Sequence, residues 1–177
     1  MNAAGKLAGG IDGFIDFVGR TISWLALAVA LVMGANVFLR YGFSIGEIWA
    51  QELEWHLLVP LTLVGMSYAL RHGEHVRVDV LFSTFKPRTK LAIDVVSAVI
   101  AMIFSALVVW LCIGFVMQSW VIGESSSNPG GIGAVYIMKA MIPVGFALLF
   151  LQSLAQAIQS VIAWRDLGAI GAGKDIQ

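Results

Sequence analysis

Residues 22–39, with the sequence ISWLALAVALVMGANVFL, decide the fold because they form 18 consecutive positions without a charged side chain. A helix needs roughly 20 apolar residues to cross the hydrocarbon core of a bilayer. Arg20 and Arg40 flank the run. The Ala-x-Ala pattern at 28–30 does not indicate cleavage, because the apolar run continues past it. We therefore expect an uncleaved membrane-spanning helix over residues 18–39.

The composition of the chain extends this expectation to further helices. Of its 177 residues, 59% are hydrophobic and 12% are charged. Soluble domains have about 45–50% apolar and about 25% charged residues. The sequence therefore predicts an all-α integral membrane protein with a single membrane domain over residues 1–177. Its four transmembrane helices are expected at about 18–39, 49–70, 91–120 and 134–164.

The distribution of Lys and Arg predicts the orientation of these helices. Nine of the eleven basic residues lie in the N-terminal segment, in the 71–90 loop or in the C-terminal tail. Because cytoplasmic segments carry the excess of Lys and Arg, both termini and the 71–90 loop are expected in the cytoplasm. The 121–133 loop is then periplasmic. Eleven acidic residues balance the basic ones, so the lipid bilayer is an expected partner and nucleic acid is not.

The two longer loops differ in character. Residues 71–90 mix apolar and charged side chains, which favours a short amphipathic segment lying in the membrane interface between the second and third helices. Residues 123–131, GESSSNPGG, have the turn-forming composition of a flexible loop. Neither loop carries a recognisable catalytic arrangement.

Few side chains in the sequence are suited to chemistry. Cys112 is the only cysteine and His56 the only histidine beside a span, which excludes a haem held by two histidines of this chain. Residues 168–175 nearly fit a phosphate-binding loop, but Asp175 replaces the required Ser or Thr. We therefore expect no enzyme activity, no cofactor, and no catalytic, substrate-binding or metal-binding residue. Two alternatives stay open: a membrane anchor of a redox enzyme, and a stand-alone four-span transporter.

Polar side chains in the spans predict contacts between helices. Gln152, Gln156 and Gln159 form a polar stripe on the last span. We expect this stripe to contact another chain, because polar side chains in membrane helices hydrogen-bond to neighbouring helices. At the periplasmic margin, we expect Arg40 to pair with Glu52 and so to fix the ends of the first two spans.

Several segments of the chain resemble the small permease subunit of tripartite ATP-independent periplasmic (TRAP) transporters, the DctQ-like family. The similarity lies in NVFLRY (36–41), WAQEL (49–53) and RHGEHVRVD (71–79), the last of which is similar to a G-x-H-x-x-V-D signature. It continues in GESS (123–126) and KAMIPVGFALLFLQ (139–152) and so covers most of the chain. The matching positions are Asn36, Arg40, Trp49, Glu52, Gly65, Gly73, His75, Asp79, Gly123, Glu124, Pro143 and Gln152.

The resemblance implies that the chain is a scaffold subunit. In this family the small subunit pairs with a large permease subunit that holds the substrate and ion sites, and a periplasmic binding protein delivers the substrate. The implied activity is import of an organic acid across the bacterial inner membrane, driven by a sodium gradient. Glu47, Glu52 and Glu124 are candidates for docking the binding protein. Gln51 stands where many relatives have a further acid.

Overall fold

The computed structural model describes residues 3–74 and 85–174. The helices in these ranges are α1 (Ala3–Phe43), α2 (Ile48–His72), α4 (Pro87–Val121) and α5 (Val135–Lys174), and the described residues contain no strand. The predicted all-α fold with four helices is confirmed. The predicted amphipathic segment, together with His75 and Asp79, lies outside the described residues.

All four helices are long and apolar enough to cross a membrane. Each predicted span lies within one helix or one residue beyond its end, but two helices are much longer than expected. Helix α1 begins at Ala3 rather than at residue 18, and α5 continues to Lys174 rather than ending at residue 164. At 1.5 Å per residue, both exceed the roughly 30 Å hydrocarbon thickness by a wide margin. Hydropathy detects only the apolar part of a helix, so it underestimates the lengths of α1 and α5.

Local sequence explains where two of the helices stop and start. Helix α2 ends at His72 and is capped by Gly73, which adopts a φ of 74°. The N–H groups of Gly73 and Glu74 donate to the carbonyls of Leu70 and Ala69, respectively. Glycine takes this left-handed conformation at low cost. Helix α4 begins with Pro87, which suits a first helical position because its missing N–H would have no partner there.

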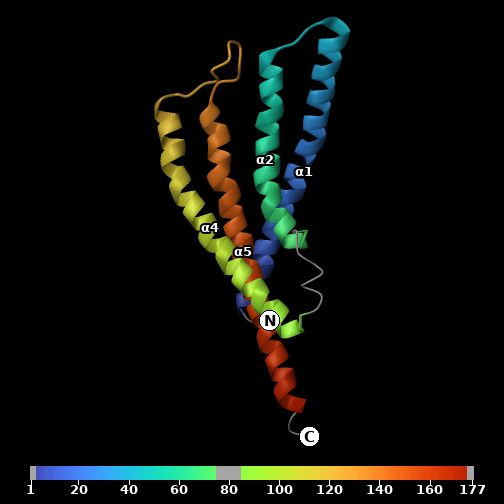
Figure 1. Ribbon diagram of the computed structural model, residues 1–177, viewed down its shortest axis with the longest axis vertical. Helices are drawn as coiled ribbons and strands as arrows, with labels where there is room; N and C mark the ends of the chain where they lie inside the picture. Colours follow the sequence, from blue (N-terminus) through green and yellow to red (C-terminus); the bar gives the residue numbers. More distant parts are fainter. Residues whose placement is uncertain (1–2, 75–84, 175–177) are drawn as a thin grey trace.

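The four helices form two helical hairpins, α1 with α2 and α4 with α5. Helix α5 contacts both α1 and α2, whereas α4 packs mainly against α5. We call the end that carries the connections 44–47 and 122–134 the hairpin end, and the opposite end the termini end. Figure 1 shows that the two hairpins lie close together at the termini end and diverge towards the hairpin end.

The buried core lies where α1, α2 and α5 meet. Ile15, Val64 and Leu148, one from each of these helices, form its centre. The backbones approach closely at Gly145 of α5, where an added Cβ would lie 2.7 Å from the Leu63 Cβ on α2. The core therefore joins one helix of the second hairpin to both helices of the first and leaves α4 at the edge.

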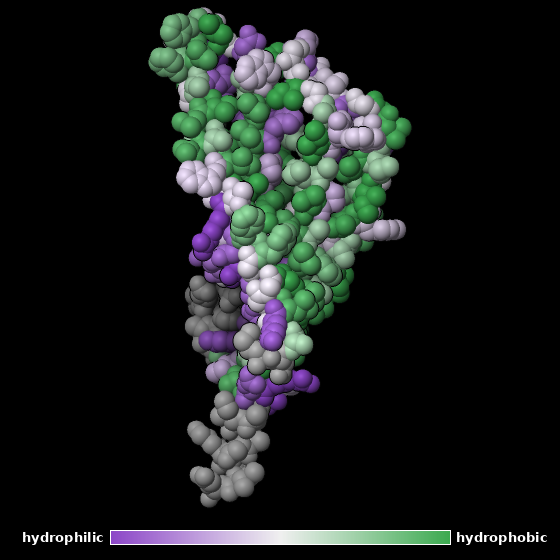
Figure 2. Space-filling view, turned by 180° about the vertical axis from the view of Figure 1, so that it is seen from behind, coloured by the Kyte–Doolittle hydropathy of each residue, from purple (hydrophilic) through white to green (hydrophobic). Residues whose placement is uncertain are grey.

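Large apolar side chains face outward on the helices. Trp24 of α1 and Trp110 of α4, for example, are each 71% exposed. Figure 2 shows hydrophobic residues over most of the broad part of the molecule and hydrophilic residues gathered towards its narrow end. A soluble monomer rarely exposes so much apolar surface, but this is the surface that a membrane-spanning chain presents to lipid or to other helices.

Candidate functional site

Glu52 ties the 122–134 loop to α2 at the hairpin end. Its carboxylate accepts hydrogen bonds from the Ser126 hydroxyl, from the Asn128 side-chain amide (2.9 Å) and from the Ile132 backbone N–H (2.6 Å). Glu52 is only 7% exposed. Gly131 lies directly against it, since an added Cβ would be 2.7 Å from both carboxylate oxygens. A carboxylate buried to this extent needs such donors to offset the loss of water.

Glu124 joins the ends of α4 and α5 within the same loop. Its Oε2 accepts hydrogen bonds from the Lys139 ammonium (2.5 Å) and the Ser119 hydroxyl (2.6 Å). The bond from Lys139, followed by that from Ser119, holds the pKa of Glu124 below its ordinary value, because both stabilise the ionised carboxylate. The loop is thus anchored to three helices through two carboxylates.

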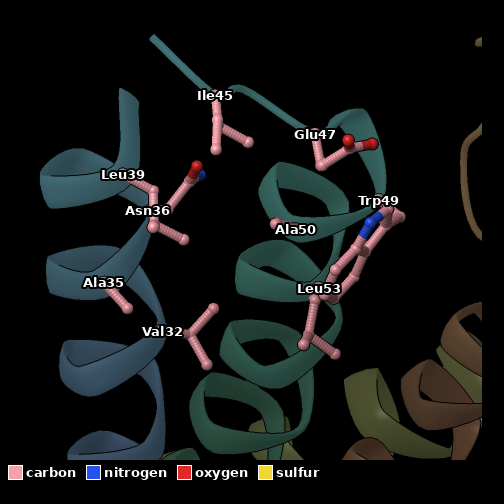
Figure 3. Close-up of a pocket in the computed structure, with 9 residues that line it drawn as sticks. All are labelled: Val32, Ala35, Asn36, Leu39, Ile45, Glu47, Trp49, Ala50 and Leu53. Carbon is pink, nitrogen blue, oxygen red and sulfur yellow. The ribbon is translucent and has the colours of Figure 1, made fainter. Parts of the chain in front are cut away.

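A small pocket lies between α1 and α2 beside their short connection. Its volume is about 200 Å³ and its lining, which includes Val32, Leu53 and Trp49, is almost wholly apolar. Figure 3 shows the residues that line it, with Val32 and Asn36 on α1 and Leu53 and Trp49 on α2. The Asn36 amide donates a hydrogen bond to the Glu54 carboxylate (3.0 Å), which joins the first two helices near this pocket.

The expected ion pair between Arg40 and Glu52 is wrong. The Glu52 carboxylate is occupied by the loop, and the Arg40 guanidinium lies 5.1 Å from the centroid of the Tyr41 ring. Three short hydrogen bonds from a neighbouring loop satisfy a buried carboxylate without requiring a long, flexible arginine to be fixed in place. At this end of the molecule, the first two helices are linked instead by the hydrogen bond between Asn36 and Glu54.

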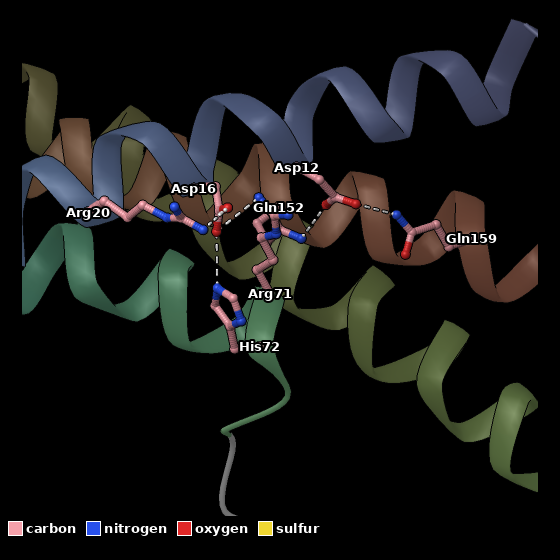
Figure 4. Close-up of polar contacts among 7 residues, drawn as sticks. All are labelled: Asp12, Asp16, Arg20, Arg71, His72, Gln152 and Gln159. Atoms are coloured by element: carbon pink, nitrogen blue, oxygen red, sulfur yellow. Dashed lines mark hydrogen bonds and ion pairs between the residues drawn. The ribbon is translucent and has the colours of Figure 1, made fainter.

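A second polar network lies near the termini end, where α1 passes the last turn of α2 (Figure 4). The Asp16 carboxylate accepts a hydrogen bond from Arg20 (3.3 Å) and lies 3.2 Å from an Arg71 nitrogen and 3.1 Å from His72 Nε2. Three cationic or potentially cationic side chains therefore surround one carboxylate. The network connects the first two helices at the end opposite to the pocket.

Asp12 extends this network to α5. Its two oxygens accept hydrogen bonds from the amides of Gln152 (3.0 Å) and Gln159 (2.6 Å), as Figure 4 shows. Two glutamines of the predicted stripe thus have a partner within the chain, and Gln152 is 97% buried. Gln156, which is partly buried, has no hydrogen-bond partner among the described residues. A contact of the stripe with another chain stays a prediction.

An apolar groove of about 600 Å³ lies between the two hairpins and is lined by α2, α4 and α5. Among its lining residues, Thr62, Lys139 and the indole N–H of Trp55 are the polar side-chain groups of this groove. The Thr62 hydroxyl donates to the Leu58 carbonyl (2.9 Å) and the Lys139 ammonium to Glu124. Beyond the indole N–H of Trp55, the groove therefore offers a hydrophilic substrate no polar side-chain group of the described residues that is not already engaged.

The described residues hold no group of three or more His, Cys, Asp and Glu side chains placed to bind a metal ion. His56 Nδ1 lies 2.7 Å from the Glu52 backbone carbonyl and so carries the proton, while its buried Nε2 has no partner. One imidazole nitrogen is a single ligand, whereas a zinc site needs three or four. Cys112 is a free, partly buried thiol on α4.

The chain is similar to proteins of one transporter family. The model of the DctQ component of tripartite ATP-independent periplasmic transporters matches residues 29–163, from the middle of α1 into the second half of α5. The chain belongs to the DctQ family. This confirms the resemblance inferred from the sequence segments.

Two DctQ-family relatives are similar to the chain at low identity. The ectoine TRAP transporter small permease protein TeaB of Halomonas elongata is 23% identical over 163 residues, which cover 89% of this chain and 83% of that protein. The C4-dicarboxylate TRAP transporter small permease protein DctQ of Vibrio cholerae is 28% identical over 107 residues, which cover 60% of this chain and 44% of that protein. The second match thus spans less than half of the relative.

The structure places most of the DctQ-like positions at the two ends of the bundle. Arg40, Trp49, Glu52, Gly123 and Glu124 lie at the hairpin end, and Gly73 and Gln152 lie towards the termini end. Gly123 adopts a φ of 61°, which glycine tolerates. Pro143 lies inside α5, and at Gly65 an added Cβ would meet no atom within 4 Å. The described residues thus give no packing reason for glycine at position 65.

Sequence reasoning missed the roles of Asp12, Asp16 and Lys139. Lys139 was noted only as the first residue of the DctQ-like segment 139–152. The two aspartates lie four residues apart and so share one face of α1. This spacing, set against Arg71 at the end of the second span, was the available signal for a contact between these helices.

Proposed function

We propose that this DctQ-family chain is the static membrane subunit of a TRAP-type secondary transporter. Its partners are a large permease subunit, which carries the substrate and the coupling ion, and a periplasmic binding protein. The chain itself performs no chemistry and holds other subunits in place. The match of residues 29–163 to the DctQ component carries this proposal.

The geometry supports a scaffold better than a carrier. The polar side chains of the two end networks are engaged with each other, and the large groove between the hairpins is apolar. A carrier that moves a hydrophilic substrate alone needs a polar site near the middle of the membrane. Broad apolar faces on the helices suit contact with lipid and with the helices of a larger subunit.

The location, orientation and substrate follow from separate arguments. The excess of Lys and Arg supports an orientation with both termini and the 71–90 loop in the cytoplasm. The bacterial inner membrane is the proposed location. Relatives named for ectoine and for C4-dicarboxylates, both of which carry carboxylate groups, support a small organic acid as the substrate. A sodium gradient is the proposed energy source.

Among the three acids predicted to dock the binding protein, Glu47 is the best placed for direct contact. Glu47 is exposed at the hairpin end, whereas Glu52 is nearly buried and Glu124 is bonded to Lys139. We propose that Glu47 and the outer face of the 122–134 loop form the docking surface. The other two acids contribute by holding that loop.

Reconstitution tests the proposed function. The chain, a large permease subunit and a binding protein are purified from a shared expression system, and uptake of labelled ectoine and C4-dicarboxylates into liposomes is measured under a sodium gradient. We expect this chain to co-purify with the large subunit and uptake to require all three proteins. Flux with this chain alone, or a haem absorbance band in the purified chain, would contradict the proposal.

A further inference from the structure

The buried position of Glu52 separates it from any direct partner. Its side chain lies beneath the 122–134 loop, and the residue is 7% exposed. All side-chain hydrogen bonds between this loop and α2, among the described residues, end on its carboxylate. Glu52 is therefore the group through which the first hairpin fixes the loop that connects the helices of the second hairpin.

The loop is shaped to receive this carboxylate. Two further backbone hydrogen bonds, from Ser126 N–H to the Ile132 carbonyl (3.3 Å) and from Gly131 N–H to the Asn128 carbonyl (3.0 Å), close it around the carboxylate. Any side chain at position 131 would collide with Glu52. The two sets of bonds orient the donors of Ser126, Asn128 and Ile132 towards one point.

The outer part of the loop is left free for a partner. Ser127, Pro129 and Gly130 are exposed at the tip. The composition of the loop is that of a flexible segment, so its single conformation depends on the anchors beneath it. A partner that binds only the ordered conformation has an apparent affinity reduced by the fraction of time for which the loop is disordered.

We propose that Glu52 is a positioning residue, which orders the 122–134 loop for recognition by the periplasmic binding protein without touching that protein. The inference rests on the proposed function and assigns Glu52 a different role from the direct docking expected from the sequence. Loss of the carboxylate leaves the residues of the loop tip unchanged, but the loop no longer keeps a single conformation. Docking then becomes weaker, while the maximal rate of transport is kept.

The test uses the reconstituted complex and two routes to the same defect. Glu52→Gln removes the charge from α2, and the double variant Ser126→Ala with Asn128→Ala removes two donors from the loop. Glu74→Gln, an exposed glutamate just past the other end of α2, is the matched control. Uptake is measured against binding-protein concentration, so that half-saturating concentration and maximal rate are obtained separately.

We expect both routes to raise the half-saturating concentration about tenfold, which corresponds to an ordered fraction of about one tenth. The maximal rate per assembled complex and the control stay unchanged. Loop order is measured independently by the mobility of a spin label on Ser127→Cys in a Cys112→Ala background, which increases in both variants. This second measurement does not depend on transport.

Three outcomes would overturn the inference. One is an unshifted half-saturating concentration in both variants, and another is a spin label that stays immobile. The third is a loss of assembled complex with an unchanged half-saturating concentration, which indicates a purely structural role. Absence of binding-protein-dependent uptake in the wild-type complex overturns the proposed function, and the inference falls with it. Normal wild-type uptake with unshifted variants overturns the inference alone.

Discussion

At the residue scale, four carboxylates with several contacts each hold the helices and their longer loop together, besides the single bond from Asn36 to Glu54. Asp12 and Asp16 on α1 bind side chains of α5 and α2, while Glu52 and Glu124 hold the loop at the other end. Each accepts at least two hydrogen bonds or ion contacts. In a chain whose apolar residues face lipid on many sides, the helices gain little from hydrophobic burial against each other. Specific polar contacts therefore contribute much of the orientation of the helices.

Asp12→Asn tests the contact between α1 and α5. The substitution keeps the shape of the side chain but replaces one acceptor oxygen with a donor that faces a glutamine amide. We expect a loss of about 1 kcal/mol in the free energy of unfolding, measured by equilibrium unfolding in mixed micelles. Asp166→Asn, an exposed aspartate on α5, is the matched control and should change it by less than about 0.5 kcal/mol. Equal effects of the two substitutions would show that the glutamine contacts carry no stability.

Glu124 gives the protein a pH-dependent contribution to stability. Because its pKa is lower in the folded chain than in the unfolded chain, its stabilising effect is complete above the ordinary pKa of a glutamate. The effect is lost as pH falls through that ordinary value and then through the lowered one. We expect Glu124→Gln to lower the melting temperature near neutral pH and to reduce the further drop on acidification. The prediction is wrong if the melting temperatures of wild type and variant fall by the same amount over this acidic range.

The contacts within the polar networks were predicted less well than the helices. Glu52 was recognised as a notable acid at a membrane margin, but its partners lie more than 70 positions away along the chain. Pairing it with Arg40 by charge ignored the neutral donors of a loop that folds back over α2. Helical spacing relates residues within one element, whereas loop closure brings together residues that no spacing rule connects.

At the scale of the element, α5 is the helix on which the others assemble. It packs against all three neighbours, and its backbone approaches α2 at Gly145, where an added Cβ would lie 2.7 Å from the Leu63 Cβ. Its polar face meets α1 through Asp12. The existence of this helix was predictable from its apolar run, but its central place was not, because hydropathy alone does not distinguish a helix that faces helices from one that faces lipid.

Gly145→Ala tests this close approach. The added methyl group collides with the Leu63 side chain and backbone, and we expect a loss of about 1–3 kcal/mol in the free energy of unfolding. Gly65→Ala is the matched control on α2, where the added group meets no atom within 4 Å. It should stabilise the isolated chain by about 0.5–1 kcal/mol, because alanine loses less backbone entropy in a helix. A stable Gly145→Ala protein would contradict the close contact between α2 and α5.

At the scale of the whole molecule, four long apolar runs were enough to predict four membrane helices. Helices α1 and α5 extend well beyond the predicted spans, since their ends continue as ordinary helix past the apolar runs. The divergence of the two hairpins had no signal in the sequence, because it depends on how the interhelical contacts are distributed along the bundle. The buried core, which joins three of the helices, shows the same dependence.

The proposed orientation predicts which residues each side of the membrane can reach. In a Cys112→Ala background, Ser127→Cys at the hairpin end should react with a membrane-impermeant maleimide in intact cells whose outer membrane has been permeabilised. Glu74→Cys, in the 71–90 loop, should react only after the inner membrane is opened. Both positions are exposed in the structure. The reversed labelling pattern would place the termini in the periplasm.

The divergence of the hairpins also matters for the surrounding lipids. A body that is broad at one end and narrow at the other, as Figures 1 and 2 show, occupies more area in one leaflet than in the opposite one. With the proposed orientation, the protein occupies the larger area in the outer leaflet. Alone in a bilayer, this wedge would favour curvature, and a neighbour that tapers in the opposite sense would restore a flat membrane.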